Sequence, residues 1–101
     1  MIMRTWYGKV PTDKADAFEA YLKETGVVDI PGTSGNQSMY AIRRRLGELT
    51  EFGVISLWDS EESIRAFAGG DPRRFRYYPR DAEFLVEMPS IADHYEVIAR
   101  S

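Results

Sequence analysis

The chain's single histidine, His94, is the side chain best suited to proton transfer near neutral pH, because imidazole titrates there. It lies in the segment ADHYEV, residues 92–97, which has the composition of a strand. Two interpretations are open. His94 is either a general base for a phenolic or enolic substrate, or a hydrogen-bonded structural residue. The face of the strand that looks into a cavity decides between them.

The stretch PRRFRYYPR, residues 72–80, has the most unusual local composition in the sequence. In one interpretation one of four arginines, Arg73, Arg74, Arg76 or Arg80, attracts an anionic ligand. Tyr77 and Tyr78 then supply rings and hydroxyl donors at the mouth of a pocket. In the other, Phe75 and Tyr78 pack inward and the arginines stay solvated.

Composition excludes several classes of function. With one histidine and no cysteine, the chain lacks the ligand sets of common zinc and non-haem iron sites. It has no nucleophile elbow, phosphate loop or dinucleotide fingerprint. The net charge of -3 opposes general affinity for nucleic acid, and LTEFG at residues 49–53 is acidic where an RNA-binding sheet of similar topology is basic. We therefore expect no metal, no cofactor and no nucleic-acid partner.

Hydropathy gives no indication of a membrane segment. No apolar run approaches the roughly 18 to 20 residues of a membrane span, and the first residues lack the features of a signal peptide. We expect no membrane partner and a cytoplasmic location.

The elements that position these residues follow the order βαββαβ. The first half is predicted to contain a strand over 2–10, a helix capped by Thr12 and ended by Gly26, and a loop over 27–37. Strands over 38–46 and 51–58 follow, joined at Gly47, and then a helix capped by Ser60 and ended by Gly69. The rest is predicted to contain a short helical piece from Asp71, a turn over 81–85 and a strand over 91–99. With antiparallel pairing this order predicts one ferredoxin-like α+β domain over residues 1–101.

The strand over 51–58 is apolar on both of its alternating faces. A helix layer covers only one face of a sheet, so the other face needs a second cover. A second copy of the chain is the economical solution, and it predicts a homodimer whose two sheets enclose a cavity.

Three segments carry a resemblance to a known family. WDSEESIRAFAG at 58–69, RYYPRD at 76–81 and HYEV at 94–97 resemble the antibiotic biosynthesis monooxygenase superfamily. The resemblance implies a dimeric α+β barrel. The superfamily includes oxygenases that oxidise aromatic substrates without metal or flavin. It also includes haem-degrading enzymes with a Trp and a His where this chain has Phe67 and Tyr77, which argues against haem degradation.

The resulting hypothesis is a homodimeric, cofactor-independent monooxygenase that acts on a small aromatic or quinol-type substrate in a cavity between sheet and helices. Its predicted site residues are His94 as base or anion-binding group, Tyr77 and Tyr78 as donors, Arg76 as charge partner, and Trp58, Phe67 and Trp6 as pocket wall. One alternative is a non-catalytic ligand-binding or structural dimer. Another is a haem-binding protein with Tyr77, Tyr78 or His94 as axial ligand.

Overall fold

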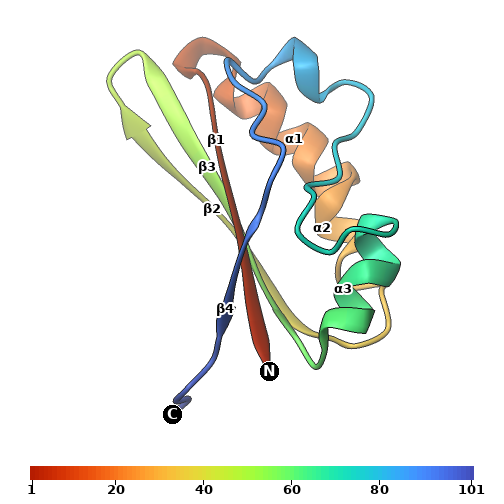
Figure 1. Ribbon diagram of the computed structural model, residues 1–101. Helices are drawn as coiled ribbons and strands as arrows, with labels where there is room; N and C mark the ends of the chain where they lie inside the picture. The colour runs from red at the N-terminus through yellow and green to blue at the C-terminus, as the bar shows by residue number, and fades with distance from the viewer.

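A four-stranded antiparallel sheet forms one layer of the molecule, and three helices form the other (Figure 1). The computed structural model describes residues 1–101. The strand order is β2-β3-β1-β4, and the bounds are β1 (Ile2–Pro11), β2 (Asn36–Leu46), β3 (Leu49–Trp58), β4 (Asp93–Glu96), α1 (Ala15–Glu24), α2 (Gly26–Asp29) and α3 (Glu61–Ala68). This arrangement confirms the predicted ferredoxin-like α+β fold.

Strand β1 lies at the centre of the sheet and pairs on both sides. It pairs with β3 along its whole length, from Ile2 opposite Trp58 to Pro11 opposite Leu49. Its pairing with β4 covers four residues only and sets Arg4 directly opposite His94. Because directly opposite residues share a face of the sheet, the Arg4 and His94 side chains lie on the same side.

The core fills the space between the helices and one face of the sheet. Alternate residues of β1 and β3 supply its sheet side because successive strand residues point to opposite faces. Aromatic contacts tie the layers together, for example Phe18 of α1 edge-on to Phe52 of β3 with ring centroids 4.9 Å apart. The core residues from the two layers are Trp6, Val10, Phe52, Val54, Trp58, Ala15, Phe18, Leu22, Ile30, Ile64, Phe67, Phe84 and Leu85.

Local signals predicted two boundaries correctly. The Ser60 hydroxyl accepts a hydrogen bond from the Ser63 amide at 3.3 Å and caps α3, which ends at Gly69 in the left-handed conformation with φ of 85°. The hairpin between β2 and β3 turns at Gly47, with φ of 69°. Both boundaries depend on residues within four positions of one another.

Two predicted boundaries of the first helix were wrong. Thr12 does not cap it. Its hydroxyl donates to the Gly47 carbonyl at 3.0 Å and lies 3.0 Å from the Thr50 hydroxyl, so it fastens the chain to the hairpin. Gly26 does not simply end the helix either. It is buried beside Leu22 and begins α2, within the segment that was predicted to be a loop from residue 27.

The C-terminal third of the chain has less regular structure than predicted. Asp71 accepts a hydrogen bond from the Arg73 amide at 3.0 Å in a turn, and no helical piece follows. The last strand covers Asp93–Glu96 rather than residues 91–99. The predicted turn over 81–85 is present as a short 3-10 helix, Asp81–Glu83. No helix in the structure is long and apolar enough to cross a lipid bilayer.

Candidate functional site

A small cavity lies between the sheet and the helices. It has a volume of about 20 Å³, enough for about one water molecule. Its lining unites residues from every layer, namely Trp6, Phe18, Leu22, Thr25, Gly26, Ile30, Val54, Phe67, Phe75, Arg76, Tyr78 and Asp81. Four predicted site residues therefore meet there: Trp6, Phe67, Arg76 and Tyr78.

Stacked rings form one wall of the cavity. Phe75 stacks on Trp6 with centroids 4.6 Å apart and an interplanar angle of 16°. Tyr77 lies edge-on to both rings, and its hydroxyl accepts a hydrogen bond from the Trp6 indole nitrogen at 3.2 Å. The same hydroxyl donates to the Pro89 carbonyl at 2.5 Å. Tyr77 thus holds the segment after α3 against the sheet, and burial raises the pKa of its hydroxyl.

A charged cluster forms the rim. The Tyr78 hydroxyl donates to Asp29 Oδ2 at 2.6 Å, and Arg76 Nη2 lies 3.8 Å from the same oxygen. The Arg76 guanidinium also stacks over the rings of Phe67 and Tyr78, at 5.2 and 5.3 Å from their centroids. Burial, followed by the hydrogen bond to Asp29, raises the pKa of Tyr78 far above its usual range. Tyr78 is therefore a neutral hydrogen-bond donor at neutral pH.

Asp81 is a buried carboxyl on the cavity wall that sequence reasoning missed. Its Oδ2 accepts a hydrogen bond from the Tyr78 amide at 2.7 Å, and burial raises its pKa. A carboxylate with a raised pKa beside an apolar cavity is a better proton acceptor than a solvated one. The available signal was an acidic residue directly after RYYPR, at the start of a helical turn.

Trp58 lies behind the cavity rather than in its wall. It is fully buried, its indole nitrogen donates to the Ser56 hydroxyl at 2.8 Å, and its ring centroid is 6.0 Å from that of Phe67. Its position supports Phe67 from the core side, so its predicted contact with substrate is indirect.

His94 faces the helix layer, which answers the question of the strand's orientation. Its Nε2 is buried and has no hydrogen-bond partner. Burial is the main cause that lowers its pKa, followed by the nearby positive charge of Arg4. His94 does not line the cavity with Tyr78, however, and the Tyr77 and Tyr78 hydroxyls are both engaged within the chain. None of the three predicted haem ligands is therefore free at the cavity.

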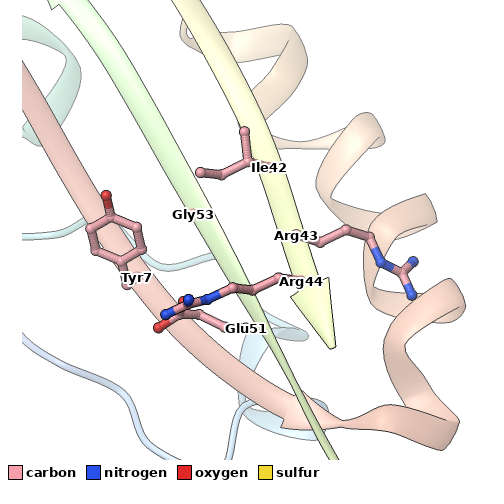
Figure 2. A pocket seen from close by; sticks show the side chains of 6 residues that line it. All are labelled: Tyr7, Ile42, Arg43, Arg44, Glu51 and Gly53. Carbon is pink, nitrogen blue, oxygen red and sulfur yellow. The ribbon is translucent and has the colours of Figure 1, made fainter. Parts of the chain in front are cut away.

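The opposite face of the sheet carries a second, open hollow of about 520 Å³ (Figure 2). Gly53 forms its floor, and Tyr7, Ile42 and the ion pair between Arg44 and Glu51, 2.7 Å long, surround it. Arg43, on the adjacent position of β2, points away toward α1, where it pairs with acidic residues. No group of three or more acidic or histidine side chains lies close enough to hold a metal ion on either face.

Comparison with known proteins gives the fold but no closer assignment. No family model matches the chain, and no curated protein sequence matches it. Solved structures do match, and they have the fold of antibiotic biosynthesis monooxygenases, as the three sequence segments predicted.

Three of these structures cover nearly the whole chain. A protein from Nitrosomonas europaea described as an antibiotic biosynthesis monooxygenase has a TM-score of 0.72 at 20% identity, over 98% of this chain and 100% of its own. One from Bacillus cereus with the same description has a TM-score of 0.66 at 14% identity, over 99% and 95%. The heme-degrader MhuD from Mycobacterium tuberculosis, with two hemes bound, has a TM-score of 0.64 at 19% identity, over 100% and 99%.

Proposed function

We propose that the protein is a homodimeric, cofactor-independent monooxygenase that oxidises a small aromatic or quinol-type substrate between sheet and helices. The observation that carries the proposal is the composition of one cavity, where stacked rings meet a cation, Arg76, and a buried carboxyl, Asp81. The shared fold with solved monooxygenase structures supports it.

The proposed oxidation requires the substrate, O2 and side chains of this chain. At a ring carbon that carries two hydrogens in the keto tautomer of the phenol or quinol, the deprotonated substrate gives its electrons to O2. A new C–O bond forms, the O–O bond breaks, and the second oxygen leaves as water with the two substrate protons. Asp81 accepts the first proton, and Arg76 stabilises the resulting anion. The aromatic wall excludes water from the reactive anion.

Substrate entry requires the cavity to enlarge from about 20 Å³. Small-molecule sites occupy roughly 300 to 1,000 Å³, so part of the wall must move. Residues 71–80 contain no helix or strand and supply Phe75, Arg76 and Tyr78 to the wall. In the proposed bound state this segment lifts and the substrate ring replaces the Phe75 ring against Trp6.

The homodimer is part of the proposal because the open face of the sheet carries apolar side chains. The large exposed ones on this face are Tyr7, Tyr40, Ile42, Leu46 and Tyr95. Large apolar side chains exposed together on one face of a sheet favour an interface. A molar mass of one chain in light scattering overturns this part of the proposal.

Oxygen consumption with a panel of quinols tests the activity. Asp81→Asn removes the proton acceptor and is expected to lower turnover by about 100-fold or more. Glu83→Gln, an exposed carboxyl in the same turn, is the matched control and is expected to keep full activity. Absence of oxygen uptake with every substrate, or equal rates for both variants, contradicts the proposal.

A second candidate, a ligand-binding dimer without turnover, is favoured by one observation. The hydroxyls of Tyr77 and Tyr78 already have partners in Pro89 and Asp29, and no histidine shares the cavity with them. Binding of a quinol in calorimetry without oxygen consumption identifies this case.

A further inference from the structure

Arg4 is a buried cation without a counter-ion. Only 3% of the residue is exposed, and it forms no ion pair. Its one hydrogen bond runs from Nη2 to the Arg74 carbonyl at 2.9 Å, and its Nε has no partner. A buried charge is unfavourable unless it is paired and fully hydrogen-bonded. Burial lowers the pKa of Arg4 to about 10, which still leaves it charged at neutral pH.

His94 faces Arg4 from the next strand and has the same deficiency. Its Nε2 is buried without a partner, directly across the β1–β4 pairing. The charges that act on it are Arg4 and Arg73, which lower its pKa, and Glu61 and Asp93, which raise it. A neutral imidazole with its proton on Nε2 donates a hydrogen bond, as Nε of Arg4 does. Two residues that each carry a buried, unpartnered nitrogen therefore lie opposite each other on one face of the sheet.

Phe75 connects this pair to the cavity. The centroid of its ring lies 5.6 Å from the Arg4 guanidinium carbon and 4.6 Å from the Trp6 centroid. Arg4 and Trp6 are two residues apart on β1, so both side chains lie under one ring. Phe67 flanks Arg4 at 5.7 Å and also lines the cavity. A flat ligand in the place of Phe75 would stack on Trp6 and carry a substituent to Arg4.

We propose that Arg4 and His94 bind the carboxylate of an aromatic acid whose ring replaces Phe75 on Trp6. This inference rests on the proposed function and narrows the substrate class to aromatic rings with an acidic substituent. A carboxylate accepts hydrogen bonds from a guanidinium and an imidazole at once, and it neutralises the buried charge. The opposing interpretation is that Arg4 is purely structural, held by two rings and one carbonyl.

Ligand pairs distinguish the two interpretations in the unmodified protein. Calorimetry with 2,5-dihydroxybenzoate, its neutral amide and hydroquinone compares one ring with and without a negative charge. We expect the acid to bind at least about tenfold tighter than the amide. Equal affinities overturn the inference, while oxygen uptake with hydroquinone leaves the proposed function standing. Binding of none of the three overturns both.

Substitutions test whether the charge of Arg4 causes the preference for the acid. Arg4→Met is expected to remove the preference for the acid, and His94→Gln to reduce it. Arg74→Met is the control, because Arg74 contacts Arg4 only through its backbone carbonyl and its side chain is exposed. An unchanged preference in Arg4→Met overturns the inference.

A spectroscopic readout needs no variant and covers the case that Arg4→Met fails to fold. The chain has one histidine, so the ¹⁵N spectrum of the labelled protein contains a single imidazole. The acid is expected to shift its Nε2 signal, and the amide to leave it in place. A signal that the acid does not move overturns the inference.

Discussion

The two faces of the sheet differ sharply although the same strands build both. On the helix-covered face Trp58 and Phe52 of β3 are 0% and 2% exposed. On the open face Tyr40 and Ile42 of β2 are 61% and 49% exposed. Strand alternation explains how one sequence makes two surfaces, but not why the second one is apolar. Unlike the covered face, the open face exposes large apolar side chains, as protein interfaces do before association.

One arginine on each face shows a second difference, in whether its charge has a partner. On the open face Arg44 pairs with Glu51 at 2.7 Å. On the covered face Arg4 has no carboxylate partner, and the neighbouring His94 lacks one for its Nε2. Satisfied charges beside apolar rings suit association with another chain, whereas unsatisfied buried nitrogens suit a ligand. The comparison therefore supports the proposals that a ligand binds on the covered face and a second chain on the open one.

The largest predicted effect concerns the covered face. Trp58→Ala is expected to lower the free energy of unfolding by about 3 to 5 kcal/mol, because it leaves a cavity beside Phe67 and removes the partner of Ser56. Urea denaturation measures the loss. Val28→Ala, an exposed position on α2, is the control and is expected to change stability by no more than about 0.5 kcal/mol. Similar losses in both variants contradict the assignment of the core.

The next effect concerns the open face. Ile42→Asp places a charge in the proposed interface and is expected to weaken dimerisation by about 100-fold, with the fold retained. Sedimentation over a range of concentrations measures the dissociation constant. Val28→Asp adds the same charge away from this face and is expected to leave association unchanged. A dimer that tolerates Ile42→Asp uses a different surface.

The sequence was sufficient for the fold wherever a signal was local. Ser60 and Gly69 delimit α3 through contacts within a few residues, and Gly47 turns the hairpin. Thr12 is an equally suitable residue type for a helix cap, but its hydroxyl donates to the carbonyl of Gly47, 35 residues away in sequence. Tertiary contacts overrode the local preference there.

The candidate site was less predictable because it depends on pairing between distant segments. The rings of Trp6 and Phe67 and the neighbouring Tyr78 were predicted from their types, and the cavity brings them together. The importance of Arg4 was not predicted, because an arginine on a strand gives no sign that its pairing partner is His94. Burial without a counter-ion is visible only after the strands are aligned.

A pair of glycines, one facing each side, sharpens the comparison. A Cβ on Gly8 would lie 2.5 Å from the Trp6 ring, which Phe75 and Tyr77 hold in place. Gly8→Ala is therefore expected to lower stability by about 1 to 3 kcal/mol. A Cβ on Gly53 would lie 2.9 Å from Tyr7, whose half-exposed ring is held by no other ring of the chain, so Gly53→Ala is expected to have a smaller effect. Thermal or urea denaturation of both variants measures the difference, and equal losses contradict it.

The smallest predicted effect is the pH dependence that His94 adds to stability. Its pKa in the folded chain is lowered from 6.5, first by burial and then by Arg4. Below about pH 6.5 the unfolded chain therefore binds a proton that the folded chain resists. The free energy of unfolding decreases as the pH is lowered through this range. At about pH 8 both states are neutral and His94 adds nothing. Urea denaturation at about pH 8 and 5.5 is expected to show a larger loss for the unmodified chain than for His94→Gln. Equal losses would mean that water reaches His94 freely, and the contrast between a dry covered face and a wet open one would not extend to β4.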